Sequence, residues 1–399
     1  MNLIPFSKQH LRLNEALPFG VRDRSGRLLL GAGAVIGSEG QLGHLQAEDL
    51  YADETESSEW RKRLTAAVDH MIRQNATLKN IADARPDEAA ASGSARLTFT
   101  EQWAELALGL DTVLRDASAA QSWLPRLASH RDRVRRLAGH RLDASLYHLI
   151  YTAGHSTQHY SSHHALLCML IGAETARMLG WTEAQVDSIE QAALTMNVSM
   201  RRLQDLLAAR DSALTAEMRE AIKSHAANAA QLLVASGCTD KIWVEAVRLH
   251  HDDSLRERPF ALLTPGQQAA RLLRRVDIFT AKMSRRATRL PMSPVQAARE
   301  ACLGQNRVPD EIGGALLKSV GLFPPGSFVE LASGEVGIVI ARGPRANQPE
   351  VAVLLNASGA PVGDPIVRHT GDARHAVKGA VPVNQVRVTP PHDRVLALR

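Results

Sequence analysis

The helical character of the chain is clearest in the segment Tyr160–Gln185, which reads YSSHHALLCMLIGAETARMLGWTEAQ. Its apolar residues recur three and four positions apart, the spacing that places them on one face of an α-helix. Gly180 lies where this helix should end, and Thr182 with Gln185 forms a capping box for the next helix. The apolar stripe of the first helix, which we expect to be core, consists of Leu166, Leu170, Ala173 and Ala176.

The same spacing continues on both sides of this segment, from about Leu97 to Gly321. Further start signals support helices there. Thr215 precedes one helical run, and Thr264–Pro265 and Ser293–Pro294 each place a capping residue directly before a proline. We therefore predict a mainly α fold in which residues 96–321 form a helical bundle.

Small β-containing units should flank the bundle at both ends. Residues 1–55 contain the strand-like runs Phe19–Val21 and Leu28–Leu30, joined by the turn-like segment Asp23–Gly26. After Pro324–Gly326, β-branched runs predict a C-terminal β unit over residues 322–399. The expected strands of that unit are Phe328–Val329, Val336–Ile340 and Val351–Leu355.

Residues 56–95 should connect the first β unit to the bundle. A polar helix is predicted from Glu59 to about Ile81. The segment Arg85–Ser94 is rich in Ala, Ser, Gly and charged residues, so we predict a linker and a domain boundary there.

The composition is that of an ordinary globular protein. With 399 residues, 45% of them hydrophobic, the chain can bury a sizeable core, and its charge of +5 is too small and too scattered to indicate nucleic-acid binding. Met1–Phe19 lacks the apolar run of a signal peptide, and no later segment predicts a membrane span. Cys168, Cys238 and Cys302 form no metal or redox motif. We therefore expect a cytoplasmic protein with reduced thiols, no nucleic-acid partner and no membrane insertion.

A series of groups within the helical region has a specific order and spacing. In chain order these are Tyr160–His164, Met196–Asn197, Leu214–Thr215, Ile222–His225, His250–Asp252, Val276–Phe279, Ser284–Arg286, Gly321–Ser327 and Ser333–Glu335. Together they resemble the HD-GYP family, HD-superfamily phosphodiesterases that open cyclic di-GMP at a site with two or three metal ions. The resemblance runs from about Tyr160 to Ile340 and implies an HD-domain helical bundle.

The resemblance implies two sets of site residues. The metal-ligand candidates are His164, His225, His250, His251 and Asp277. Imidazoles with a carboxylate are groups that hold divalent iron or manganese. His250 and His251 are adjacent, so both can line one cavity only near a helix end, which the polar residues after them predict. Arg286 and Arg289 match positions beside the phosphates of the ligand.

The central ligands of the family are missing from this chain. Where family members carry Leu-His-Asp-Ile-Gly-Lys, the His and Asp are Met196 and Asn197, and Met200 replaces the Lys. A thioether is a poor ligand for such ions, and a neutral amide cannot bridge two metals as a carboxylate does. Tyr160 also replaces an acidic ligand, and Ser254–Phe260 replaces the Gly-Tyr-Pro loop. Without a metal cluster there is no obvious source of a hydroxide nucleophile.

Several candidates have an ordinary structural alternative. For His164 it is a packed or solvent-facing histidine, for His225 it is an ordinary histidine of the core, and for the two arginines it is a solvated basic face. Asp277 lies inside an apolar run, where a buried charge needs a partner, which favours a role in the site. The remaining histidines of the region, expected to be exposed polar surface, are His155, His159 and His163.

We therefore expect a catalytically impaired regulatory or binding module of cyclic di-GMP signalling, with no cofactor or a weakly bound divalent metal. The candidate partners are cyclic di-GMP and signalling proteins. One alternative is an active phosphodiesterase in which the surviving histidines and Asp277 hold a reduced set of iron or manganese ions. Another is a protein–protein scaffold that binds no nucleotide.

Overall fold

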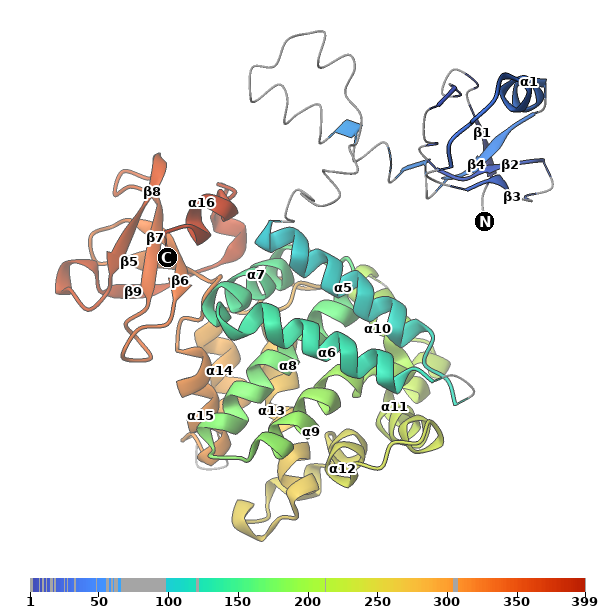
Figure 1. Cartoon of the computed structure of the whole chain (residues 1–399). Helices are drawn as coiled ribbons and strands as arrows, with labels where there is room; N and C mark the ends of the chain where they lie inside the picture. Colours follow the sequence, from blue (N-terminus) through green and yellow to red (C-terminus); the bar gives the residue numbers. More distant parts are fainter. Residues whose placement is uncertain are drawn as a thin grey trace. The chain divides into compact units, whose positions relative to one another are not determined.

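The chain forms two compact units, Met1–Leu97 and Thr98–Arg399, in a computed structural model (Figure 1). The described residues are 98–398 apart from 120, 121, 212 and 304–307, and 3–65 apart from 7, 9, 10, 12, 15, 16, 18, 25, 27, 32, 33, 48, 55, 56, 59 and 61–63. The helix expected from Glu59 to Ile81 and the linker Arg85–Ser94 lie, except for a few positions, outside these residues.

The first unit contains a small antiparallel sheet with strand order β1-β4-β2-β3. Its elements are β1 (Leu3–Pro5), β2 (Val21–Arg22), β3 (Leu28–Leu30), α1 (Glu39–Ala47) and β4 (Tyr51–Asp53). The hairpin prediction is confirmed, because Val21 pairs with Leu30 and Gly26 adopts the positive φ of 87° that a tight turn favours. The sequence did not predict α1.

The second unit begins with the helical bundle. Its helices are α5 (Phe99–Arg115), α6 (Leu124–Gly139), α7 (Leu142–His155), α8 (Tyr160–Met178), α9 (Glu183–Thr195), α10 (Arg201–Ala209), α11 (Ala216–Ala235), α12 (Lys241–Leu249), α13 (Pro265–Met283), α14 (Pro294–Cys302) and α15 (Glu311–Val320). The predicted capping residues Thr182, Thr215, Thr264 and Ser293 each accept a hydrogen bond from the first turn of their helix. Gly180 follows α8 with φ of 75°, as a helix-terminating glycine does.

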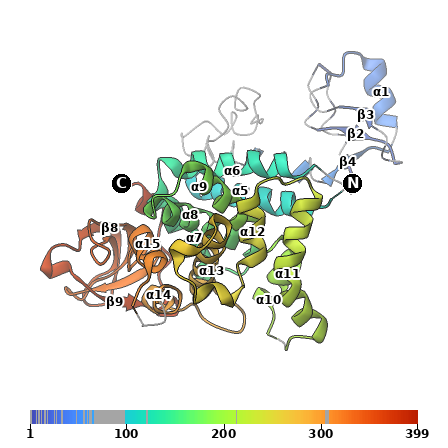
Figure 2. The ribbon, with the colours of Figure 1, turned by 90° about the horizontal axis from the view of Figure 1, so that it is seen from below.

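Helix α8 is the centre of the bundle. It packs against α5, α7, α9, α10, α13 and α15, and both views place it inside the bundle (Figure 1; Figure 2). The predicted apolar stripe is buried, from Leu166 at 0% exposure to Leu170 at 5%. Because α8 is covered on nearly all sides, polar side chains at its N-terminal end lie in the interior of the unit.

The C-terminal part of the second unit is a five-stranded antiparallel sheet with order β8-β7-β6-β5-β9. Its elements are β5 (Phe328–Leu331), β6 (Val336–Ala341), β7 (Glu350–Leu355), β8 (Pro361–His369), β9 (Val377–Val381) and the short helix α16 (His392–Leu396). The three strands expected from the sequence are confirmed, and β8, β9 and α16 were not predicted. The structure is therefore mainly helical with small antiparallel sheets toward both ends.

The C-terminal sheet packs on helix α7. Strand β6 contacts α7, and the Tyr147 hydroxyl lies 3.0 Å from Nδ1 of His392. Gly326 has φ of 88°, and a Cβ there would lie 2.5 Å from the carbonyl oxygen of Tyr147. Only glycine allows this close approach of the chain to α7. Among the described residues, no helix is long and apolar enough to span a membrane.

Candidate functional site

Three of the predicted ligand histidines come together at the ends of neighbouring helices. His225 lies within α11, and α12 ends at Leu249, so His250 and His251 occupy its C-terminal boundary. One ring nitrogen from each histidine lies within 4.8 Å of the others. The expectation of a helix end at the adjacent pair is confirmed. We call His225, His250 and His251 the three-histidine group.

Backbone carbonyls orient two of these rings. Nδ1 of His225 bonds to the carbonyl of Ile222, and Nδ1 of His250 bonds to the carbonyl of Val247 at 2.7 Å. A carbonyl only accepts, so each Nδ1 carries the proton and each Nε2 presents a lone pair. The two Nε2 atoms face each other at 3.2 Å.

The protonation of the three-histidine group suits metal binding. Burial first, and then the charge of His251, lower the pKa of His250 to about 3. Burial also lowers the pKa of His225 and of His251. Neutral imidazoles with converging lone pairs repel each other unless they share a cation. Two nitrogens bound at about 2.1 Å to one tetrahedral ion would lie about 3.4 Å apart, close to the spacing of the two Nε2 atoms.

His164 and Asp277 form a separate pair beside this group. His164 on α8 is buried at 2% exposure, and its Nε2 lies 2.8 Å from Oδ1 of Asp277 on α13. Burial lowers the pKa of His164, but Cys168 and the bond to Asp277 outweigh it and raise the pKa well above its ordinary value. Burial raises the pKa of Asp277, yet the bond from His164 and the charges of His164, His250 and His251 hold it at about 2. The carboxylate is therefore engaged in an ion pair with His164.

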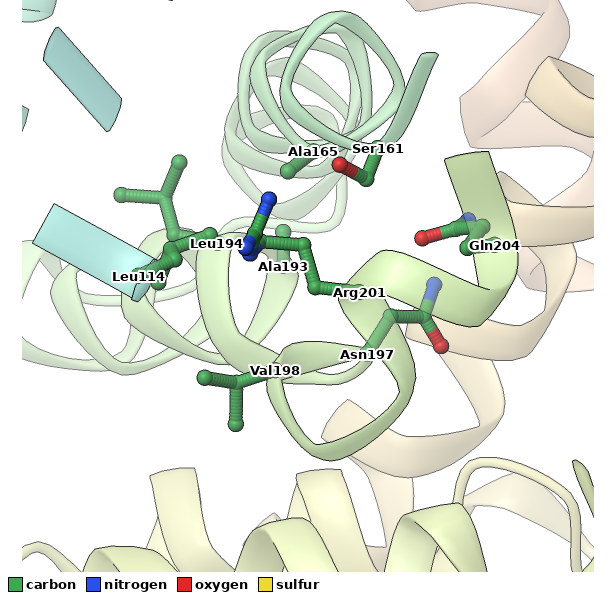
Figure 3. A pocket seen from close by; sticks show the side chains of 9 residues that line it. All are labelled: Leu114, Ser161, Ala165, Ala193, Leu194, Asn197, Val198, Arg201 and Gln204. Atoms are coloured by element: carbon green, nitrogen blue, oxygen red, sulfur yellow. The ribbon is translucent and has the colours of Figure 1, made fainter. Parts of the chain in front are cut away.

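Met196 and Asn197 lie at the C-terminal end of α9, and neither side chain belongs to the three-histidine group. Met196 is 1% exposed and belongs to the main hydrophobic core. Asn197 lines a cavity of about 10 Å³, and its buried Oδ1 has no hydrogen-bond partner among the described residues. Such a volume holds roughly one water molecule. Figure 3 shows this cavity, with Arg201 and Gln204 beside Asn197.

A buried charge cluster closes the same cavity. Arg201 is 8% exposed and forms an ion pair with Asp111 of α5. Asp205 accepts hydrogen bonds from the backbone and side chain of Ser161 at 2.7 and 3.0 Å. These residues were not predicted from the sequence. The sequence signal that could have indicated them is the spacing of Arg201 and Asp205, which places both on one face of α10.

Arg286 and Arg289 lie at the end of α13, on a tight turn. Their backbones bond to each other in both directions at 3.2 Å. The Arg286 guanidinium donates to the hydroxyl of Tyr160 at 3.1 Å and lies over its ring, which in turn stacks on His164. Burial, and then the charge of Arg286, lower the pKa of Arg289. Neither arginine forms an ion pair with a carboxylate of the described residues, so two adjacent cations are available to an anion.

Of the three histidines expected at the exposed surface, one is exposed and two are half-buried. His159 is exposed, but His155 and His163 are half-buried. Burial lowers the pKa of His163 to about 4, and His155 stacks on Tyr151 with ring centroids 3.8 Å apart. The expectation was wrong for these two, because the ring of His155 also packs against Phe328 of β5 and His163 lies near His148 of α7.

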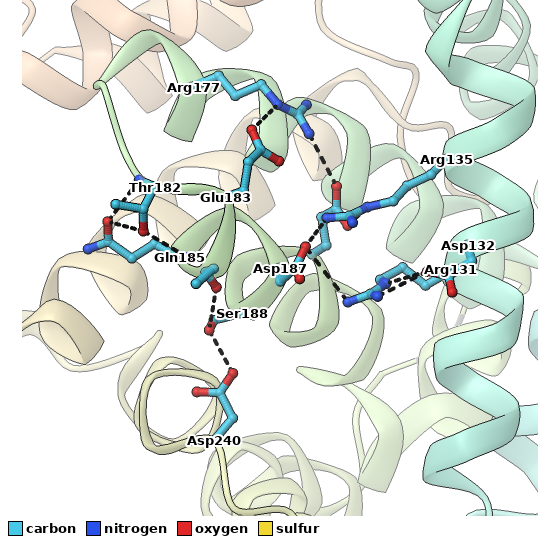
Figure 4. A network of polar contacts seen from close by, with 12 residues as sticks. Arg131, Asp132, Arg135, Arg177, Thr182, Glu183, Gln185, Asp187, Ser188 and Asp240 are labelled. Atoms are coloured by element: carbon cyan, nitrogen blue, oxygen red, sulfur yellow. Dashed lines mark hydrogen bonds and ion pairs between the residues drawn. The ribbon is translucent and has the colours of Figure 1, made fainter.

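A polar network fixes α9, the helix whose C-cap is Met196. Arg135 of α6 pairs with Asp187 and with the buried Glu190 of α9. Ser188 donates to Asp240, the N-cap of α12, at 2.6 Å. Figure 4 shows these contacts around α9. The network fixes α9 against α6 and α12, so Met196 has a defined place in the core.

One curated protein is similar to the chain. Over 209 residues the chain is 26% identical to a cyclic di-GMP phosphodiesterase of Pseudomonas aeruginosa. The similarity covers 51% of this chain and 49% of the relative, so the chain spans about half of that protein. No family model matches the chain. No solved structure matches it either.

Proposed function

We propose that the protein is a regulatory or nucleotide-binding module of cyclic di-GMP signalling, built on a phosphodiesterase-like HD-GYP bundle whose catalytic centre is incomplete. The similarity to a cyclic di-GMP phosphodiesterase supports the signalling context. The geometry around α9 and α13 supports the loss of catalysis. Signalling proteins are proposed as further partners.

The burial of Met196 in the core carries the proposal. Where the resembling family places a metal-binding imidazole, this chain places an apolar side chain with 1% exposure. Asn197 beside it supplies no negative charge, and the carboxylate of Asp277 is paired with His164. Two divalent ions held close together need an anionic bridge, and none of these groups provides it.

The donor set fits one ion rather than a cluster. Three neutral imidazoles with converging nitrogens suit a single divalent ion such as zinc, iron or manganese. When bound, such an ion would supply Lewis-acid polarisation of a phosphate oxygen or of water. His225 and His250 would hold it through Nε2, with their Nδ1 atoms fixed by backbone carbonyls. The Asp277 carboxylate would lie near the bound ion and contribute a negative charge without binding it.

The phosphates of a bound nucleotide would contact Arg286 and Arg289. Both guanidinium groups lack carboxylate partners among the described residues, and Tyr160 positions one of them. Guanidinium groups match phosphate oxygens in bidentate geometry. Nucleotide recognition would therefore rest on charge-assisted hydrogen bonds rather than on a metal cluster.

A second candidate function is a slow phosphodiesterase that uses one metal ion. The three-histidine group favours it, because this group retains the orientation that metal binding needs. In that case His250→Ala should abolish hydrolysis measured with manganese present. The regulatory proposal instead expects no detectable hydrolysis by the parent protein.

Calorimetry with cyclic di-GMP tests the proposal. The parent should bind without hydrolysing the nucleotide, and Arg286→Ala and Arg289→Ala should each weaken binding roughly tenfold, the effect of one lost charge-assisted contact. Arg285→Ala is the matched control, since Arg285 is exposed on the same segment. Robust hydrolysis of cyclic di-GMP by the parent would support the phosphodiesterase function instead. If the parent does not bind the nucleotide, the remaining hypothesis is a scaffold that binds no nucleotide.

A further inference from the structure

A second cavity lies far along the chain from the histidines, where α15 meets the C-terminal sheet. It has a volume of about 320 Å³ and is lined by the end of α15 and by the β6–β7 loop. The lining residues are Lys318, Gly321, Phe323, Arg342, Gly343, Pro344, Arg345, Ala346 and Pro349. None of them belongs to the site described above.

The charged side chains of this cavity are all cationic. Arg342 has a structural role, since its guanidinium donates hydrogen bonds to Asp143 and to the carbonyl of Ser319. Lys318 and Arg345 differ, because both are exposed and neither forms an ion pair with a carboxylate of the described residues. Lys318 lies in the last turn of α15, where it also offsets the helix dipole. The helix dipole accounts for a cation at position 318, but it does not account for Arg345 in the β6–β7 loop.

The backbone around the cavity is fixed before any ligand arrives. The β6–β7 loop is tied to the end of α15 by the bond from Leu322 N–H to the Ala346 carbonyl at 2.8 Å. Gln348 N–H bonds to the Arg345 carbonyl at 2.9 Å, which closes the loop on itself. A Cβ at Gly343 would meet the carbonyl oxygen of Gln348 at 1.6 Å, so this close approach requires glycine. Preorganisation lowers the entropy lost when a ligand binds.

The walls between the cations are apolar. Pro344, Pro349 and Phe323 also line the cavity, and Phe323 belongs to the small core of the sheet. A cavity of this size is at the lower end of the range for small-molecule sites, which combine apolar walls with a few placed polar groups. Two uncompensated cations at the rim select a ligand that carries at least two negative charges.

We propose that this cavity binds a small soluble phosphorylated molecule, with Lys318 and Arg345 contacting its phosphate groups and the apolar walls contacting its organic part. The ligand class includes mononucleotides. Because β6 packs on α7, a ligand bound in this cavity would also influence the contact between the sheet and the bundle. The site is independent of Arg286 and Arg289.

Calorimetry with pyrophosphate and with GMP, on the full chain at low ionic strength, tests this proposal. The parent should bind both, and Lys318→Glu with Arg345→Glu should weaken binding roughly a hundredfold or abolish it, since two charge-assisted contacts become repulsive. The matched control is Arg136→Glu with Arg387→Glu, which reverses another last-turn cation and another exposed loop cation. The control should bind like the parent, and circular dichroism should show that both variants are folded.

Three results would overturn the proposal. The first is the absence of binding to either probe by the parent. The second is an equal loss in the control variant, which would indicate non-specific attraction to net positive charge. The third is loss of pyrophosphate binding in an Arg286→Ala, Arg289→Ala double variant that keeps Lys318 and Arg345. The last result would show that pyrophosphate binds at Arg286 and Arg289 instead. It would not test whether the protein binds cyclic di-GMP.

Discussion

The Met196 side chain is buried in the main hydrophobic core. Its thioether lies among apolar neighbours at the end of α9, and the adjacent Asn197 Oδ1 faces a cavity with room for about one water molecule. An imidazole placed there would exchange apolar contacts for an uncompensated polar group. Under the proposed function, the absence of a metal ligand at this position and the apolar packing of the core therefore have the same cause.

Restoring the family residues should consequently not restore catalysis. We predict that Met196→His with Asn197→Asp lowers the free energy of unfolding by about 1 to 3 kcal/mol, because a buried polar group is left without a partner. Hydrolysis of cyclic di-GMP should stay far below that of an intact phosphodiesterase, since Tyr160 and Met200 are unchanged. Chemical denaturation and a manganese-supplemented assay measure the two effects.

Met196→Leu is the control for this pair of substitutions. A volume-conserving apolar change should cost less than about 1.5 kcal/mol. The interpretation fails if the double variant is as stable as the parent and hydrolyses the nucleotide rapidly.

Part of the candidate site could be predicted at the level of single residues. The adjacent pair His250 and His251 indicated a helix end with a shared cavity, and a charge in an apolar run indicated a partner for Asp277, which proved to be His164. The role of Tyr160 could not be predicted. Its contact with Arg286 joins positions 126 residues apart, which only the packing of α8 against the end of α13 brings together.

Two neighbouring glycines in α15 differ sharply in what surrounds them. A Cβ at Gly313 would lie 2.0 Å from the carbonyl oxygen of Cys302 in α14, whereas a Cβ at Gly314 would meet nothing within 4 Å. Gly313 thus sets the distance between α14 and α15. Gly314 has no comparable packing role.

Alanine at these two positions should have opposite effects on stability. Gly314→Ala should raise the free energy of unfolding by about 0.5 to 1 kcal/mol through helix propensity. Gly313→Ala should lower it by about 1 to 3 kcal/mol, because a backbone carbonyl cannot move aside without separating the helices. Thermal or urea unfolding of both variants measures the difference. Equal effects of the two substitutions would contradict this view of the α14–α15 contact.

Elements with local signals were predictable, and those without were not. The helix starts at Thr182 and Ser293 follow from side chains three residues from their partners. Strand β8 carries Pro361, Gly363 and Pro365, residues that disfavour strands, and it forms only because β7 pairs with it. Its existence depends on a partner strand rather than on its own sequence.

The stability of the whole molecule should depend on pH through buried histidines. Burial, and then the charge of Arg133, lower the pKa of His130 in α6 to about 4. In the unfolded chain this group titrates near pH 6.5. Between these values the unfolded chain binds a proton that the folded chain does not, so stability is complete above about pH 6.5 and falls as the pH drops toward 4.

We therefore predict a loss of roughly 2 to 3 kcal/mol from this group as the pH falls from about 6.5 to about 4. Denaturant unfolding of metal-free protein across this range measures it. His130→Leu should flatten the dependence while leaving the other histidines to contribute theirs. A slope that is unchanged in His130→Leu would show that His130 is not the titrating group.

The number of metal ions per chain is the most direct test of the central claim, that the phosphodiesterase-like centre is incomplete. After purification and exposure to iron, manganese or zinc, elemental analysis should find no more than one tightly held ion per chain. His250→Ala should remove that ion, because it deletes one of the two Nε2 donors that face each other. Two or more tightly held ions per chain would contradict the account and would indicate an intact phosphodiesterase centre.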